Sequence, residues 1–272
     1  MSDRGPTTDR DGHSLALVGP GRAGLSVATA LRALGWRVRG VSGRDPLVPS
    51  VRAAASQFGA VAGSAADVVG GVELVIVACP DAAIGAVAAE IAPVVDASTL
   101  VIHLAGSVGV GALSALSCRT GALHPLQTMP TAELGAARLS GSWCAIAGDP
   151  EVAAIARALG MHPFSIADAD RGAYHAAACI ASNHLVALLA QVEACTAVPV
   201  DAFLPLVRAT VDNVADLRPA AALTGPVARG DVETVRRHLD AIPAGERDAY
   251  RALARRAAVL AGRDPDLGGV LA

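Results

Sequence analysis

The stretch GPGRAG at residues 19–24 decides the fold. It follows a short apolar run, Leu15–Val18, and opens an Ala- and Leu-rich segment, Leu25–Leu34. A strand, a glycine turn and a helix are the context that a dinucleotide-binding loop needs, because the free N–H groups at the helix start face the phosphates. An ordinary glycine-rich turn is the alternative interpretation. The cofactor contacts predicted here are Gly19, Gly21, Arg22, Ala23 and Gly24.

A second predicted strand, Trp36–Val41, ends in Ser42-Gly43-Arg44. An NAD-binding site normally has Asp or Glu near this position, where the carboxylate holds the ribose 2′-hydroxyl. Here Ser42 and Arg44 stand in its place, and a guanidinium can bind a 2′-phosphate with two hydrogen bonds. The sequence therefore predicts NADPH as the cofactor in preference to NADH. A solvated loop arginine is the alternative for Arg44.

The composition is that of a globular protein. Among 272 residues, 53% are hydrophobic and 17% charged, and the net charge is −3. This balance, without a basic stripe, favours neither nucleic acid nor a membrane surface as a partner. All 22 basic residues are arginine, so no lysine is available as a catalyst.

The cysteines indicate a reducing compartment. They are odd in number, scattered and without a CxxC pair, which favours reduced, mostly buried thiols in a cytoplasm and predicts no metal site. Residues 1–13 are polar and read as a disordered leader. The apolar stretch Ala176–Ala190 contains Ser182, Asn183 and His184, and reads as a buried helix rather than a membrane span. The cysteines are Cys79, Cys118, Cys144, Cys179 and Cys195.

Short apolar runs alternate with Ala-rich helices from Leu15 to about Ile166, which predicts an α/β fold with a parallel sheet covered on both faces. Beyond about Asp168 the strand signal vanishes. We therefore expect a Rossmann domain at 14–167 and a smaller all-α domain at 168–272. Further strands are expected at Val72–Ala78, Leu100–Leu104, Gly121–His124, Trp143–Ala147 and His162–Ile166.

The C-terminal part predicts four helices and a punctuated loop. Many of these helices are rich in Ala and Leu, and we do not expect four of them to bury all their apolar faces internally, which predicts a homodimer built through this domain. The expected segments are a helix at Tyr174–Ala197, a helix at Val200–Leu217 broken near Pro205, a loop at Ala220–Gly230, and helices at Asp231–Ala241 and Glu246–Ala261.

Ligands of parallel sheets bind at the carboxyl ends of the strands. Three predicted strand ends carry candidate contacts. Asp81 is also expected to cap the helix that follows it. His103 lies within a strand near the expected nicotinamide side, where it either contacts cofactor or is a satisfied core residue. The candidates at these ends are Cys79, Pro80, Asp81, His103, Ala105 and Gly106.

His124 is the preferred catalytic candidate. The run His124-Pro125-Leu126-Gln127 ends a predicted strand, and the proline is expected to stop that strand and leave the imidazole at the sheet edge. An imidazole titrates near neutral pH, which suits proton transfer to a carbonyl oxygen as hydride arrives. The alternative is a histidine that hydrogen-bonds its own loop.

Polar residues also recur on the helix after Tyr174. His175, Cys179, Ser182 and Asn183 share one face at α-helical spacing, and they either meet the cofactor cleft or form a buried hydrogen-bond network. In the later loop Arg229 either clamps a carboxylate or pairs with Asp231. The predicted catalytic residues are His124, His175 and Asn183, and the predicted substrate contacts are Gln127, Ser182, Thr224 and Arg229.

These motifs occur in an order that resembles a known family. The glycine turn, the Cys79-Pro80-Asp81 turn, HPLQ at 124–127, YHAAA at 174–178 and LTGPVARGD at 223–231 resemble Rossmann-like proteins with a C-terminal domain of unknown function, number 2520. The resemblance implies an NADP-type oxidoreductase similar to ketopantoate reductases and hydroxyacid dehydrogenases, with a C-terminal domain like that of 6-phosphogluconate dehydrogenase. The His-Pro pair also resembles that of prephenate-type dehydrogenases, where the histidine serves the substrate hydroxyl.

Two positions depart from the pattern that the resemblance implies. Ala105 stands where a hydroxyl residue is expected, and aligning Asn183 with the reductases' asparagine puts Cys179 in place of their lysine. His124 or His175 must then act as the acid. The sequence thus predicts NADPH-dependent hydride transfer to a small oxo or imino acid. A non-catalytic NADP-binding sensor or scaffold, and a deazaflavin-dependent NADP oxidoreductase, are the alternatives.

Overall fold

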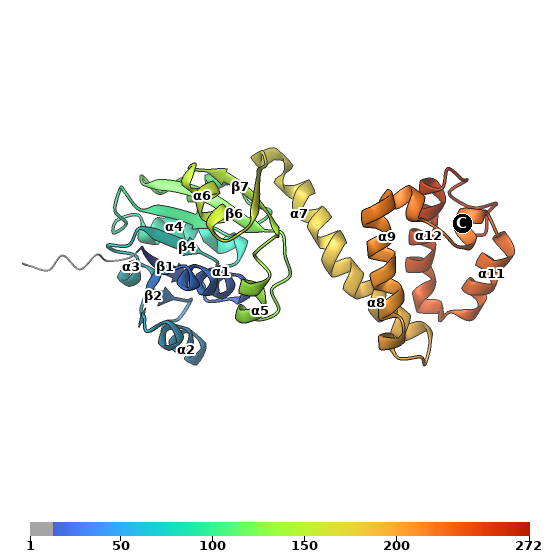
Figure 1. Ribbon diagram of the computed structural model, residues 1–272, viewed down its shortest axis with the longest axis horizontal. Helices are drawn as coiled ribbons and strands as arrows, with labels where there is room; N and C mark the ends of the chain where they lie inside the picture. Colours follow the sequence, from blue (N-terminus) through green and yellow to red (C-terminus); the bar gives the residue numbers. More distant parts are fainter. Residues whose placement is uncertain (1–12) are drawn as a thin grey trace, which may run out of the picture. The chain divides into compact units, whose positions relative to one another are not determined.

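The computed structural model describes residues 13–272. Within it the chain forms two compact units, the first ending at Cys179 and the second comprising Ile180–Ala272 (Figure 1). The predicted domain boundary after Ala167 lies ahead of this division. Of the predicted disordered leader, residues 1–12 lie outside the described residues. His13 is described, and its Nδ1 lies 2.7 Å from Oε2 of Glu73 while its ring stacks on Trp36.

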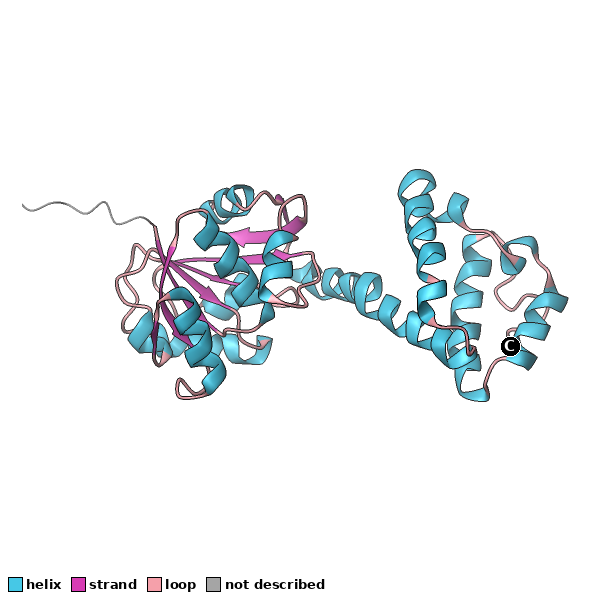
Figure 2. Cartoon of the chain, turned by 60° about the horizontal axis from the view of Figure 1, so that its bottom comes forward, coloured by secondary structure: helices cyan, strands magenta, loops and turns pink. Residues whose placement is uncertain are grey.

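The first unit is built on one eight-stranded sheet, as the predicted α/β class requires, with helices on both sides (Figure 2). The strand order is β3-β2-β1-β4-β5-β6-β7-β8, which extends the Rossmann order. The strands are β1 (Ser14–Val18), β2 (Arg37–Ser42), β3 (Val61–Ala62), β4 (Leu74–Val77), β5 (Leu100–His103), β6 (Arg119–Pro125), β7 (Trp143–Gly148) and β8 (His162–Ser165).

Alternate residues of the central strands feed two separate cores. In β1, Leu15 and Leu17 face one core while Ala16 and Val18 face the other, as the period of two in a strand dictates. One face is covered by α1 (Arg22–Ala33), α2 (Pro49–Phe58) and α6 (Glu151–Ala158), and the other by α3 (Ala65–Val68) and α4 (Ile84–Ile91). Burial on both faces explains the continuous apolar runs in the sequence.

The sheet is not wholly parallel, so that part of the prediction is wrong. β7 pairs antiparallel with β6, and His124 lies opposite Ala145. After β6 the chain forms α5 (Ala132–Ala137), which lies beside α1 (Figure 1). The chain then returns to the sheet at the end where β6 finishes, so β7 runs in the opposite direction to β6. Pro125 does not stop the strand at His124. It remains in the ladder opposite Cys144 as the last residue of β6.

The turn from β1 to α1 leaves no space for two side chains. Gly19 has a φ of +94°, and a Cβ there would lie 2.6 Å from the carbonyl carbon of Ala78. A Cβ on Gly24 would lie 2.6 Å from the carbonyl oxygen of Gly19. A Cβ on Gly21, by contrast, would meet nothing within 4 Å. The first and third glycines therefore close the turn, while the second faces open space.

The second unit is helical. Its elements are a π-helical turn at Ile180–His184, α8 (Leu185–Cys195), α9 (Leu204–Ala222), α10 (Pro226–Arg229), α11 (Val232–Ala241) and α12 (Arg247–Leu260), and α7 (Arg171–Cys179) precedes them in the first unit. Pro205 does not break a helix as predicted. It lies in the first turn of α9, where a missing N–H costs nothing. The break comes instead at Arg218, with φ +68°, just before Pro219.

The small core of the second unit lies away from α8 and α9. It is formed by Val235, Leu239, Ala254, Leu267 and Leu271, so the segment after α12 contributes two of its residues. Asp231 is the N-cap of α11, because its carboxylate accepts a hydrogen bond of 3.0 Å from the backbone of Thr234. The predicted buried helix at Ala176–Ala190 is wrong for the single chain, since every residue in it is exposed or half-buried.

The glycine turn yields a paired stability prediction. Gly24→Ala should destabilise the protein by about 1–3 kcal/mol, because the added methyl meets backbone that cannot yield. Gly21→Ala should cost far less, because the same methyl enters open space. Denaturant unfolding of both variants measures the difference. Equal losses in the two variants would contradict the packing argument.

Candidate functional site

A cleft of about 670 Å³ opens in front of the glycine turn. Its walls come from the carboxyl ends of β1, β2 and β4, where the strand order of the sheet reverses direction. Six predicted cofactor residues line it: Gly19, Gly21, Ser42, Arg44, Cys79 and Pro80. Sequence reasoning did not single out the further lining residues Asp45, Ser50, Ser64 and Glu90.

The end of β2 places one cation and one carboxylate in this cleft. Arg44 and Asp45 both line it and both are exposed. The backbone N–H of Leu47 donates to Oδ1 of Asp45 at 2.8 Å, which ties that carboxylate to its own turn. Ser42 is buried beneath them. The cleft therefore offers the Arg44 guanidinium, which has no partner among residues 13–272, beside the Asp45 carboxylate, which is hydrogen-bonded to its own turn.

The other predicted cofactor residues are placed differently. Arg22 and Ala23 open α1, and Gly24 packs beneath the turn. Asp81 does not cap the following helix, since its side chain accepts no hydrogen bond from that helix backbone. Its carboxylate instead accepts a short hydrogen bond from the Ser107 hydroxyl. Asp81 thereby links the end of β4 to the loop after β5.

His103 is a buried residue with both ring nitrogens engaged. The backbone N–H of Ala105 donates to its Nδ1 at 3.2 Å, so Nε2 carries the proton and donates to the carbonyl of Gly109, also at 3.2 Å. Burial lowers its pKa and keeps the ring neutral. No nitrogen remains for the predicted cofactor contact. Of the two alternatives, the structure favours the satisfied core residue, which holds the loop at Ala105–Gly109.

The two candidate catalytic histidines lie together beside Gly106. A Cβ on Gly106 would lie 2.8 Å from Nε2 of His124 and 2.7 Å from Nδ1 of His175. The two ring centroids are 5.7 Å apart. Nδ1 of His124 lies 2.8 Å from the hydroxyl of Tyr174, and Nε2 of His175 lies 3.8 Å from the Cys179 thiol. The close backbone approach requires glycine at position 106.

The surroundings of His124 keep its ring neutral. Burial lowers the pKa of His124 to about 4, and the neighbouring His175 and the charge of Arg171 add to this effect. Burial also raises the pKa of Tyr174, so its hydroxyl keeps its proton at neutral pH. At pH 7 the pair is therefore a neutral imidazole and a neutral phenol. A neutral imidazole is ready to accept a proton rather than to donate one.

The predicted polar face past Cys179 does not follow α-helical spacing. Ser182 and Asn183 lie in the π-helical turn, in which each residue advances the helix by a smaller angle than in an α-helix. The offsets that aligned them with His175 therefore do not hold. Ser182, Asn183, Thr224 and Arg229 belong to the second unit. Gln127 is exposed after β6, and its side-chain oxygen accepts a hydrogen bond from the backbone of Thr128.

The predicted pairing of Arg229 with Asp231 is not formed as a salt bridge among residues 13–272. The Asp231 carboxylate instead receives hydrogen bonds from the backbone and the hydroxyl of Thr234. Those bonds lower the pKa of Asp231, and the charge of Arg229 adds a smaller effect. Arg229 therefore remains available to a ligand.

The sequence did not predict a role for two residues of this region, Tyr174 and Arg171. Tyr174 contacts His124, although the motif containing it was quoted without a role for its hydroxyl. Arg171 is fully buried in the first turn of α7, where the sequence shows an ordinary arginine near a helix start. Only the tertiary packing reveals either one, because neither has a distinctive spacing from His124.

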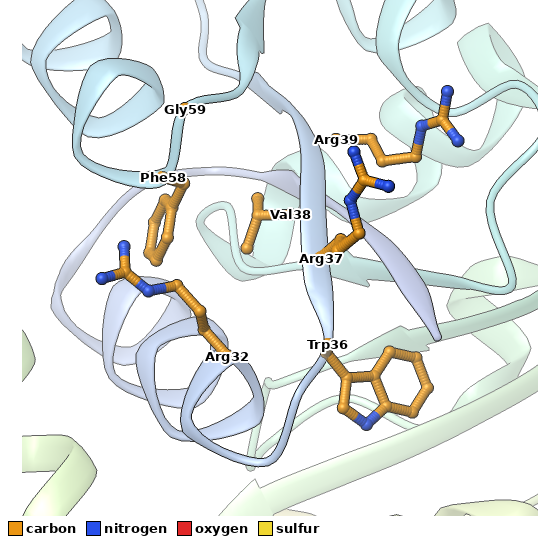
Figure 3. A pocket seen from close by; sticks show the side chains of 7 residues that line it. All are labelled: Arg32, Trp36, Arg37, Val38, Arg39, Phe58 and Gly59. Carbon is orange, nitrogen blue, oxygen red and sulfur yellow. The ribbon is translucent and has the colours of Figure 1, made fainter. Parts of the chain in front are cut away.

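A second hollow of about 320 Å³ lies at the amino end of β2 (Figure 3). Arg37 and Arg39 project to one side of the strand and Val38 to the other, toward Phe58 (Figure 3). Arg32 donates a hydrogen bond of 2.6 Å to the carbonyl of Gln57 and lies over the Phe58 ring. This arginine holds α1 against α2. The hollow lies at the opposite sheet edge from the glycine turn.

Three further sequence predictions concern a metal site, the cysteine thiols and the apolar helical stretch. No group of three metal-ligating side chains occurs among residues 13–272. All five cysteines are free, but only Cys144 is buried, whereas mostly buried thiols were expected. By length and composition one helical stretch, Asp168–Cys195, could cross a membrane, and that alone is weak evidence.

Comparisons with known proteins agree with this architecture. Residues 5–130 match the Rossmann-like domain family, and residues 142–257 match the domain of unknown function DUF2520. No curated protein matches the chain in sequence.

Several solved structures resemble the whole chain. A candidate NADP oxidoreductase from Bacteroides fragilis is 25% identical, with a TM-score of 0.74 and coverage of 93% of this chain and 97% of that one. A protein from Thermotoga maritima is 25% identical, with a TM-score of 0.68 and coverage of 91% and 98%.

A more distant likeness concerns the fold alone. The NADP-bound pyrroline carboxylate reductase of Plasmodium falciparum is 12% identical, with a TM-score of 0.59 and coverage of 96% and 99%. The sheet order, the glycine turn and the two matched domains lead to one assignment. The chain therefore combines a Rossmann-like domain with a DUF2520 domain.

Proposed function

We propose that this protein is an oxidoreductase that uses a nicotinamide dinucleotide, NADP(H) in preference to NAD(H). The observation that carries the proposal is the glycine turn itself. Packed neighbours leave no space for a side chain at Gly19 or Gly24, whereas Gly21 faces the open cleft at the start of α1. A helix start with unpaired N–H groups and no acidic side chain in its first turn suits a pyrophosphate.

The preference for NADP(H) rests on the end of β2. Arg44 lines the cleft, where its guanidinium can bind a 2′-phosphate. The neighbouring Asp45 would disfavour that phosphate, but its carboxylate is turned to the backbone of Leu47. The candidate NADP oxidoreductase from Bacteroides fragilis, similar over 93% of this chain, supports the same cofactor.

His124 is proposed to handle the proton. The bound cofactor supplies or accepts the hydride. The substrate hydroxyl gives its proton to Nε2 of neutral His124 when oxidised, and the imidazolium returns it when the oxo group is reduced. In this proposal Nδ1 carries the proton of the neutral ring and donates a hydrogen bond to the Tyr174 hydroxyl oxygen, 2.8 Å away, which leaves Nε2 free to accept and orients the ring in both directions. His124 thus takes the part that lysine plays in related reductases.

A small oxo or imino acid is the proposed substrate class. Gln127, Ser182, Asn183, Thr224 and Arg229 remain the proposed contacts to its polar groups, with Arg229 unpaired in the described chain. His175 is the rival to His124, since its Nδ1 points at the same glycine. We propose a cytoplasmic setting, which the five free thiols support.

We also propose a homodimer built through the helical unit. Neither α8 nor α9 contains a buried residue in the single chain. Val186 and Leu206 are 68% and 65% exposed. Large apolar side chains at this exposure favour burial against a second copy.

Arg44 gives the sharpest test of cofactor choice. Arg44→Ala should weaken NADPH binding roughly ten- to hundredfold and leave NADH nearly unchanged, because one charged hydrogen bond contributes about 1.5–3 kcal/mol. Calorimetric titration of both cofactors measures this. Asp45→Asn is the matched control, which should not weaken NADPH. Equal losses for NADPH and NADH in Arg44→Ala would contradict the assignment.

His124→Gln should lower turnover by at least about a hundredfold, because the proton carrier is lost, while NADPH affinity stays within a few-fold. Steady-state assays with 2-oxo acids and NADPH titration measure the two quantities. His175→Gln is the matched variant. If it abolishes turnover and His124→Gln does not, His175 holds the proton instead.

Light scattering at micromolar concentration should give twice the chain mass of 27.1 kDa. Val186→Glu on α8 should shift the protein toward the monomer, because a charge at a dimer contact loses its water. A wild-type monomer at that concentration would contradict the dimer.

A further inference from the structure

Arg171 is a buried cation that leaves four of its five N–H donors unpaired among residues 13–272. Its side chain is fully buried, and its Nε donates to Oδ1 of Asp168 at 3.1 Å. Nη1 and Nη2 are both buried without a hydrogen-bond partner in the described chain. Burying an ionised guanidinium is strongly unfavourable unless its donors are paired. A bound anion that accepts hydrogen bonds from Nη1 and Nη2 would satisfy these donors.

Two contacts place this cation at the reaction site. Arg171 lies one turn before His175 on α7, and the ring centroid of His175 is 5.7 Å from that of His124. Asp168, the partner of Arg171, lies against Gly109, whose carbonyl accepts the hydrogen bond from His103. These residues all belong to the first unit. The buried Nδ1 of His175, which also lacks a partner, faces Gly106 beside Nε2 of His124. Three unpaired buried donor or acceptor atoms therefore occur in one small region.

Asp168 fixes the orientation of the guanidinium. Its carboxylate occupies the place that a Cβ on Gly109 would fill, 2.2–2.6 Å away, and it pairs with the Nε side of Arg171. The two Nη groups form the opposite edge of the fork. That edge matches the two oxygens of a carboxylate in a bidentate pair.

From these contacts we infer that Arg171 binds the carboxylate of the substrate beside His124. The inference rests on the proposed function and deepens it: the substrate is an acid whose reacting oxygen lies close to its carboxylate, as in a 2-oxo or 2-hydroxy acid. Arg229, the clamp that the sequence predicts, is then not the primary carboxylate contact. Because the guanidinium is enclosed in the free chain, the adjoining Ala105–Gly109 loop must shift to admit the ligand.

The bound carboxylate also changes His124. Burial is the largest cause of the low pKa of His124, Arg171 on α7 lowers it further and Asp81 after β4 raises it, and the titratable His175 on α7 and His103 on β5 also face it. A carboxylate paired with Arg171 neutralises one of the charges that hold the pKa of His124 near 4. The pKa of His124 must therefore rise when the acid binds. The same event that orients the substrate also increases the fraction of His124 that carries a proton to donate.

The test uses oxamate, a non-reducible analogue of a 2-oxo acid, with its neutral ethyl ester as the matched probe. Proton–carbon NMR follows the His124 ring signal in the cofactor-free protein, assigned by its absence from His124→Gln. Oxamate should raise the pKa of His124, while the ester and an equal concentration of chloride should not. Oxamate without effect on His124, or an equal effect of chloride, would overturn the inference.

Two variants identify the arginine responsible. Arg171→Lys keeps the charge but loses the fork, so it should weaken oxamate roughly ten- to hundredfold and leave NADPH affinity unchanged. Arg229→Gln should change oxamate affinity much less. The reverse ranking would overturn the inference, and so would unchanged affinity in Arg171→Lys. Should Arg171→Lys misfold, the wild-type NMR titration still decides.

The two proposals fail in different ways. Oxamate binding is measured without cofactor, so a protein that binds oxamate through Arg171 but never binds NADPH refutes only the proposed function. A protein that binds NADPH but not oxamate refutes only the Arg171 site.

Discussion

The turn between β1 and α1 has no room for a side chain at two of its glycines, and the rest of the first unit depends on that constraint. Gly19 lets β1 approach the backbone at Ala78, and Gly24 lets α1 lie against the same region. This close approach brings the start of α1 to the carboxyl edge of the sheet, beside the ends of β2 and β4. The cleft is a consequence of that packing.

The loops after β5 and β6 arrange the second half of the site by a similar close approach. Gly106 admits two imidazoles against its backbone, and His103 holds the loop because its Nδ1 accepts from Ala105 and its Nε2 donates to Gly109. His124 is thereby half-buried next to Tyr174 and remains neutral at pH 7. Its proton affinity is set by burial and by neighbouring charges, so a ligand that alters those charges also alters the chemistry.

Much of the first unit could be predicted from the sequence because its signals are local. The apolar run before GPGRAG, Arg44 at the end of β2, and the run at His124 each reveal a strand end within a few residues. Long-range effects could not be predicted. The antiparallel entry of β7, the π-helical turn at Ser182 and Asn183, and the burial of Arg171 all depend on how distant segments pack. His103 was ambiguous because its partners lie in a loop whose shape the sequence does not reveal.

We propose that the open space at Gly21 holds a nicotinamide dinucleotide. Calorimetric titration of NADPH into the wild-type protein and Gly21→Ala, with thermal unfolding of both, tests this directly. We expect nearly equal melting temperatures and at least about tenfold weaker NADPH binding in the variant, because the methyl enters only the ligand's space. Equal NADPH affinity in the two proteins, or a wild type that does not bind NADPH, would contradict it.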